Sequence, residues 1–211
     1  LRVGVEQDWS RLRPSSDEGV DPGSLRFDET LASVRFGVDS FDDANFPGRG
    51  RFGRAEWVHV LASDLEEDGL TFASLLAQQA WSVAGNRMVA GLEAGDSFAG
   101  TARFPRAVAG GLFRLSGYAE DELRGSRLAI GTLRLARPIA GEAARNPLYV
   151  GGSVELGAVL PDGAAMRWED AVVNGSLYVA VDSVLGPIFV YVGVAEGGHR
   201  SWGFSLGRQL F

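Results

Sequence analysis

The sequence predicts an all-β chain, an antiparallel up-and-down transmembrane β-barrel with about ten strands present. Apolar and polar residues alternate in one run after another, which is the pattern of half-buried strands. The connections between these runs are alternately long and short, as in outer-membrane barrels with short turns at one rim and long loops at the other. No run of 18 apolar residues is present, so no transmembrane helix is expected, whereas a barrel strand needs only about 9 to 11 residues.

Composition excludes several classes of protein. The chain has 211 residues and a formal net charge of -7, which argues against nucleic acid as a partner, because nucleic-acid binders display basic patches. Cysteine is absent, so disulfides and thiolate metal sites are excluded. We expect no cofactor and no metal.

The N-terminal half contains five expected strands, at residues 1–9, 26–38, 51–61, 70–83 and 87–98. The second strand shows the pattern clearly, since one face is apolar and carries Ala32, Val34, Phe36 and Val38. The fourth and fifth are joined by residues 84–86, a short hairpin connection. The first strand alternates only weakly, whereas the second has the apolar face and the polar face of a wall between two different solvents.

The connection at residues 40–50, SFDDANFPGRG, predicts a tight turn. Pro47 and Gly48 are a turn signal, and the carboxylate of Asp42 can accept hydrogen bonds from local backbone amides. Asp42 and Asp43 together also allow a metal site, although the turn is the favoured interpretation.

The C-terminal half contains five more expected strands, at residues 127–137, 147–160, 175–184, 187–196 and 199–210. Pro138 is expected to end the first of them, and a helical turn is expected within residues 166–173. The last strand has one apolar face, formed by Trp202, Phe204, Leu206 and Leu210. Its other face is small and polar, with Ser201, Gly203, Ser205, Gly207 and Gln209.

Between the two halves lies a long polar segment, FRLSGYAEDELRG, at residues 113–125. It has Gly117 and Gly125 at turn-like positions, three consecutive acids at 120–122, and Arg124. That is too much polar chemistry for a hairpin tip, so we expect the segment to have a function.

Four segments of the chain carry a resemblance to a known family. They are this segment, the strand YVGGSVELG, the pair of strands in GSLYVAVDSVLGPIFVYVGVAEGG and the terminal SWGFSLGRQLF. Together they resemble the C-terminal barrel of bacterial patatin-like outer-membrane proteins. Those barrels belong to the surface-antigen and outer-membrane assembly-factor superfamily. The resemblance covers residues 26–211 and is densest after Phe113. It implies that residues 1–211 are the C-terminal portion of a larger barrel, because five strands follow the long loop and the missing strands are N-terminal.

The resemblance also implies roles for individual residues. The loop at about 99–126 would fold into the barrel lumen, where Arg124 and Gly125 contact the inner wall. Because an unpaired buried charge is costly, Arg124 would pair with Glu155 or Asp182; the alternative is an exposed arginine at the base of the loop. The turn residues Asp42, Asp43, Phe46, Pro47 and Gly50 would form a periplasmic turn. The terminal strand would be an assembly signal made of Trp202, Phe204, Leu206, Leu210 and Phe211, although Phe211 is one residue out of phase.

The function implied by the resemblance is an outer-membrane barrel that anchors or translocates an upstream patatin-like phospholipase domain. The expected location is the bacterial outer membrane, with the lipid bilayer, the outer-membrane assembly machinery and upstream passenger or periplasmic domains as partners. An alternative in the same class is an assembly factor that inserts other barrels. Any lipase activity would belong to the upstream domain, so this chain itself is not expected to be an enzyme.

A few residues allow an enzymatic interpretation. Ser205 lies in GFSLG, which matches the G-x-S-x-G nucleophile motif, and Asp162 lies in an Asp-Gly-Ala that resembles the patatin dyad. A nucleophile elbow needs a strand-to-helix turn, and only four residues follow Gly207. His59 and His199 lack metal-ligand spacing, and a rim hydrolase built on Glu196 and His199 is a minor alternative. A soluble β-sandwich fails on the lipid-like alternation of the last three strands.

Overall fold

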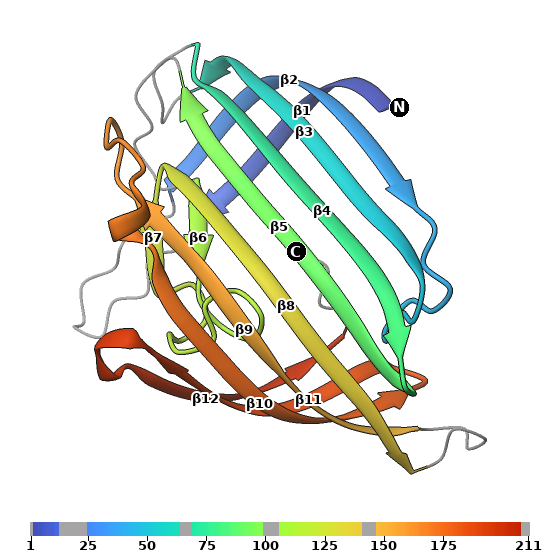
Figure 1. Ribbon diagram of the computed structural model, residues 1–211. Coiled ribbons are helices and arrows are strands. Elements are labelled where there is room, and N and C mark those ends of the chain that lie inside the picture. Colours follow the sequence, from blue (N-terminus) through green and yellow to red (C-terminus); the bar gives the residue numbers. More distant parts are fainter. Residues whose placement is uncertain (1, 13–24, 64–68, 99–105, 141–146, 208–211) are drawn as a thin grey trace, which may run out of the picture.

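The computed structural model describes residues 2–12, 25–63, 69–98, 106–140 and 147–207, and it is all-β (Figure 1). Ten strands form one sheet in which every pair of neighbours is antiparallel, with the order β1-β2-β3-β4-β5-β8-β9-β10-β11-β12. This confirms the predicted antiparallel up-and-down class. The strands are β1 (Arg2–Leu12), β2 (Leu25–Asp39), β3 (Gly50–Ser63), β4 (Thr71–Val83), β5 (Asn86–Phe98), β8 (Arg127–Ala140), β9 (Leu148–Leu160), β10 (Val172–Ser183), β11 (Gly186–Ala195) and β12 (Arg200–Leu206).

The long connection between β5 and β8 has structure that the sequence pattern does not predict. Two short strands, β6 (Ala107–Ala109) and β7 (Leu123–Gly125), pair with each other in a separate two-stranded sheet. We call residues 106–125 the inserted segment. Figure 1 shows β6 and β7 on the concave side of the curved ten-stranded sheet.

Element boundaries differ from the expectation in several places; β10, for example, begins at Val172 and not at residue 175. Strand β8 does not end at Pro138 but continues to Ala140, with a register shift against β9 that accommodates the missing proline N–H. The helical turn expected within residues 166–173 is a single 3-10 turn, η1 (Trp168–Asp170), and a second one, η2 (Glu196–Gly198), links β11 to β12. None of the helices in the described ranges has the length and hydropathy to cross a membrane.

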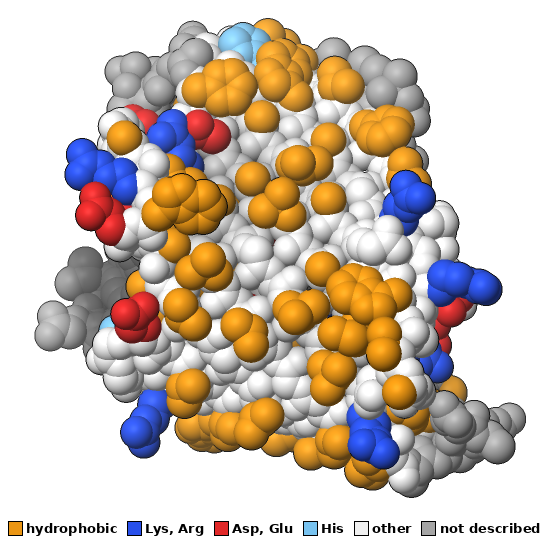
Figure 2. Space-filling view, viewed as in Figure 1, with side chains coloured by type: hydrophobic (Ala, Val, Ile, Leu, Met, Phe, Trp, Pro, Cys, Tyr) orange, Lys and Arg blue, Asp and Glu red, His pale blue; other side chains and the backbone are white. Residues whose placement is uncertain are grey.

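The two faces of the sheet differ in character. On β11, Val190, Val192 and Val194 are exposed on the convex face, whereas Phe189 and Tyr191 are buried on the concave face. The same alternation of exposed and buried residues recurs on β9 and β10. Figure 2 shows one side of the convex surface, where apolar side chains cover the middle and charged ones gather toward the borders. The hydrophobic core therefore lies on the concave side, between the sheet and the inserted segment.

Candidate functional site

A buried carboxylate on β9 binds the inserted segment. Glu155 is fully buried, and its two oxygens accept hydrogen bonds from the backbone N–H of Ser116 at 2.5 Å and from the Ser116 hydroxyl at 2.6 Å. The Ser153 hydroxyl also donates to Glu155, and it lies 2.6 Å from the hydroxyl of Ser176. The positive charge of Arg134 on β8 acts on the same carboxylate. Because a buried charge must be hydrogen-bonded and compensated, Glu155 depends on the inserted segment for part of its stabilisation.

The backbone around Ser116 is held by three further strands. The Ser116 carbonyl accepts a hydrogen bond from the Ser201 hydroxyl on β12 at 2.5 Å. It lies directly over Gly193 on β11, where any side chain would collide with it. The next amide, of Gly117, donates to the side-chain oxygen of Asn174 on β10 at 3.1 Å. The inserted segment is thus bonded across several adjacent strands to the concave face of the sheet, which we call the wall.

An ion pair holds the inserted segment to β5. The guanidinium of Arg114 donates to both carboxylate oxygens of Glu93, at 3.0 and 2.6 Å, and to the carbonyl of Val108 at 2.7 Å. This bidentate geometry is the stronger form of an arginine–carboxylate pair. The sequence alone gives no partner for Glu93, which lies within the strand expected at residues 87–98. An acid among small residues on one face of a strand is the signal that could have suggested one.

The predicted role of Arg124 is corrected by the structure. Arg124 is exposed, and its Nε donates to the carbonyl of Asp121 within the same turn at 3.1 Å. The two acids proposed as its partners are bonded elsewhere, Glu155 to Ser116 and Asp182 to the Asn45 amide at 2.7 Å. Adjacent side chains of a strand point to opposite sides. Since the flanking residues of β7 are turned toward the wall, Arg124 points away from it.

Gly125 does lie against the wall, as the resemblance implied. It is buried, and a side chain at this position would collide with the Leu160 carbonyl at the end of β9. The next residue, Ser126, continues the contact, because its N–H donates to the same carbonyl at 2.9 Å. Glycine is therefore required here for close approach of the two backbones.

The backbone of the inserted segment is unusual at two buried residues. Phe113 and Leu115 have positive φ values of 68° and 71°, a region that costs energy for residues other than glycine. Both side chains are almost completely buried, and Leu115 packs in a cluster with Tyr118, Leu128 and Ile130. Burial of these large side chains offsets the backbone strain.

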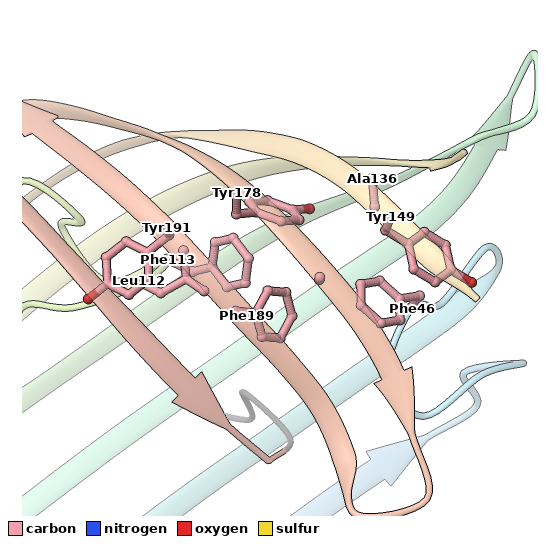
Figure 3. Packing of buried hydrophobic residues seen from close by; sticks show 9 residues of the cluster. Phe46, Leu112, Phe113, Ala136, Tyr149, Tyr178, Phe189 and Tyr191 are labelled. Atoms are coloured by element: carbon pink, nitrogen blue, oxygen red, sulfur yellow. The ribbon is translucent and has the colours of Figure 1, made fainter. Parts of the chain in front are cut away.

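Phe113 also belongs to an aromatic cluster that fills the concave side (Figure 3). Its ring makes edge contacts with Tyr178 and Phe189, at centroid distances of 5.3 and 5.6 Å. The guanidinium of Arg134 lies 4.9 Å from the centre of the Phe113 ring, within the range of a cation–π interaction. Phe46, from the connection between β2 and β3, joins the cluster from another part of the chain.

The connection at residues 40–50 is the turn that the sequence predicts. One oxygen of Asp42 accepts the amides of Gly48 and Arg49, both at 2.9 Å. Partial burial acts to raise the pKa of Asp42, but these hydrogen bonds, with the charge of Arg87, outweigh it and hold that pKa below its ordinary value. Asp43 accepts the amides of Asn45 and Phe46, so both aspartates stabilise the turn.

The other turn residues explain the sharp reversal. Phe46 and Pro47 are buried, and the Phe46 ring stacks on Tyr149 of β9 with centroids 3.9 Å apart. Gly50 has a φ of 108°, and a side chain there would collide with the Ser40 carbonyl. The sequence predicts the turn but not its inward direction, because Phe46 is part of no periodic pattern.

The terminal strand has the predicted faces as far as the structure describes it. Trp202, Phe204 and Leu206 are exposed, at 83%, 65% and 55% of their surface. Leu210 and Phe211 lie outside the described residues, so the predicted end of the assembly signal stays a prediction.

The residues considered for catalysis lie in ordinary structural positions. Ser205 is inside β12, opposite Phe189, and is not at a strand-to-helix turn. Asp162 is exposed and accepts the Gly163 amide at 3.0 Å. His59 contacts Thr71 and Trp57, and His199 packs on Tyr118.

Within the described ranges, no group of three or more potential metal ligands comes together. Comparison of the sequence with protein-family models and with curated proteins gives no match. The resemblance to patatin-like barrels therefore stays a proposal that depends on the segments quoted for it.

Proposed function

We propose that this chain forms the wall and plug of an outer-membrane β-barrel that anchors or translocates an upstream patatin-like phospholipase domain. The observation that carries the proposal is the contrast between the two sides of the sheet. The convex side is a band of exposed aliphatic and aromatic residues, and the concave side binds an inserted segment through a buried carboxylate. Lipid on one side and a plugged lumen on the other account for both.

The exposed apolar residues would favour aggregation of the chain in water. Leu177, Val190, Trp202 and Phe204 each expose more than half of their surface, and they come from three neighbouring strands. Soluble monomers rarely expose contiguous apolar patches of this kind, whereas a bilayer makes them favourable. Closure of the sheet through its edge strands, β1 and β12, is part of the proposal.

The membrane part is tested by refolding the chain into vesicles whose lipids carry bromine atoms that quench tryptophan. A variant that keeps Trp202 as its single tryptophan is expected to be quenched strongly. A matched variant that keeps only Trp168, which is exposed in the 3-10 turn η1, is expected to be quenched much less. Equal quenching of the two, or a monomeric chain that stays soluble without detergent, would contradict the proposal.

The passenger part is tested in cells. A tagged soluble domain fused upstream of residue 1 is expected to become outer-membrane associated only when the fused barrel folds. The isolated chain is expected to hydrolyse no lipid ester above background, and Ser205→Ala is expected to change nothing. Ester hydrolysis that is lost in Ser205→Ala would contradict the non-enzymatic assignment.

A further inference from the structure

The connection between β2 and β3 is longer than chain reversal requires. At the same rim, β4 and β5 are joined by residues 84–85, and β10 and β11 by residues 184–185. Residues 40–49 make the corresponding connection between β2 and β3. Two residues suffice for an antiparallel hairpin, so the extra length calls for another explanation.

This connection folds onto the concave face and is anchored to several strands. The Asn45 amide donates to Asp182 on β10 at 2.7 Å. Arg87 on β5 donates to the Asp43 carboxylate at 3.2 Å and to the Phe46 carbonyl. The Ser82 hydroxyl on β4 donates to the backbone of the same turn at 2.9 Å. These bonds fix the turn across the concave side between β4 and β10.

Its aromatic ring extends the contact further around the wall. Phe46 stacks on Tyr149 of β9 and lies 5.7 Å from Phe189 of β11, measured between ring centroids. Phe189 is also in contact with Phe113 of the inserted segment. The turn and the inserted segment therefore meet the same wall residue from opposite directions, as Figure 3 shows.

A small cavity of about 40 Å³ remains between them. Phe46 and Asn45 line it from the turn, Phe113 from the inserted segment, and Ala136 and Arg134 from β8. A space of this size holds about one water molecule. The turn and the inserted segment thus line the same cavity from two directions.

We propose that residues 40–50 are a second closure of the barrel interior, in series with the inserted segment and at the short-turn end. Ions or a polypeptide pass only when both elements are displaced. The inference rests on the proposed barrel function, because it needs an interior that crosses the membrane.

The test uses a single engineered thiol between the two closures. The chain has no cysteine, so Ala136→Cys, at a cavity-lining position that is 7% exposed, introduces the only one. A small charged maleimide that does not cross lipid is added to one side of vesicles containing the refolded chain. Leu185→Cys, on an exposed short turn, and Trp168→Cys, at the long-loop rim, report which side is which.

Two sets of substitutions loosen one closure each. Asn45→Ala with Phe46→Ala removes the Asp182 bond and the aromatic contacts of the turn. Loss of such contacts corresponds to about a tenfold change in an opening equilibrium. Ser116→Ala with Glu155→Gln loosens the inserted segment instead.

We expect the thiol of the Ala136→Cys variant to be protected from both sides when neither closure is loosened. With the turn loosened, the thiol should react about tenfold faster from the short-turn side only. With the inserted segment loosened, it should react from the long-loop side only, and ion conductance should rise fully only when both sets are combined.

Two results would overturn the proposal of a second closure. One is a thiol that stays protected from the short-turn side in the turn variant. The other is full conductance after only the inserted segment is loosened. Failure of the proposed function itself looks different. In that case, neither Leu185→Cys nor Trp168→Cys shows sidedness, because the chain does not span the bilayer.

Discussion

At the level of single residues, the fit between the inserted segment and the wall depends on the absence of side chains. Gly193 is the clearest case, since an added methyl would collide with the Ser116 carbonyl. That carbonyl is fixed by Ser201, and the Ser116 amide is fixed by Glu155, so the backbone cannot shift without losing both bonds.

We therefore predict that Gly193→Ala destabilises the folded chain by about 1–3 kcal/mol, the usual cost of overpacking. The matched control is Gly131→Ala on β8, where the nearest atom would be the Leu156 carbonyl oxygen at an ordinary 3.8 Å. Urea unfolding in lipid, followed by tryptophan fluorescence, measures both. Equal loss of stability in the two variants would show that strand glycines matter for a reason other than this contact.

Glu155 and Arg124 are two residues that the sequence suggested as an ion pair. Glu155→Gln replaces one accepting oxygen by an NH2 group, which donates and cannot accept one of the two Ser116 bonds, so we expect a loss of about 1–3 kcal/mol. Arg124→Ala removes an exposed side chain and is expected to change stability by less than about 0.5 kcal/mol. A double-mutant cycle between them should show no coupling. Coupling would restore the ion pair that the sequence suggested.

At the level of elements, the turn at residues 40–50 is stabilised by the negative charge of the Asp42 carboxylate. The folded pKa of Asp42 is depressed, so its carboxylate stabilises the turn above the unfolded pKa of about 3.9. This contribution is lost as the pH falls through the folded pKa, when the carboxylate is protonated.

The corresponding prediction concerns Asp42→Asn. At neutral pH the variant should unfold at a lower urea concentration than the wild type, because the asparagine accepts the Gly48 and Arg49 amides without a charge. The difference between the two proteins should be constant above about pH 5 and should shrink as the pH falls below about 4. A difference that grows toward acid pH would mean that the carboxylate is unfavourable in the turn.

At the level of the whole molecule, much of the sheet could be predicted from the sequence because its two faces meet different surroundings. The alternation on β11, with valines outside and Phe189 and Tyr191 inside, is sufficient to assign both the strand and its faces. Two three-residue strands such as β6 and β7 carry too few residues to show any period, so they could not be predicted.

The interior contacts were less predictable because they join residues far apart in the chain. The inserted segment contains three arginines, Arg106, Arg114 and Arg124, and the sequence does not say which of them faces the wall. Glu93 pairs with Arg114. Arg124 points away from the wall, because both of its neighbours in β7 are turned toward the wall. Phe46 likewise packs inward through contacts with strands that lie about a hundred residues later. The types of residue needed in the site were recognisable, but their pairing was not.

The last prediction tests the orientation of the whole sheet at its final strand. Phe204 is exposed on the convex face, so Phe204→Arg should place a charge in lipid, at a cost of about 2–4 kcal/mol near the middle of the bilayer. Ser205 is the next residue and is less exposed than Phe204; the pocket that both border also includes Glu120, Asp121 and Arg114. Since the two acids can pair with an introduced arginine, Ser205→Arg should be tolerated. The fraction of chain that becomes protease-resistant on addition of vesicles measures insertion. On the proposed barrel function, Phe204→Arg should remain digestible while Ser205→Arg inserts like the wild type, because the barrel would place lipid at the first position and the acids of the inserted segment near the second. The reverse order would place the apolar face of β12 toward the interior and would require the lipid and plug sides of the sheet to be exchanged.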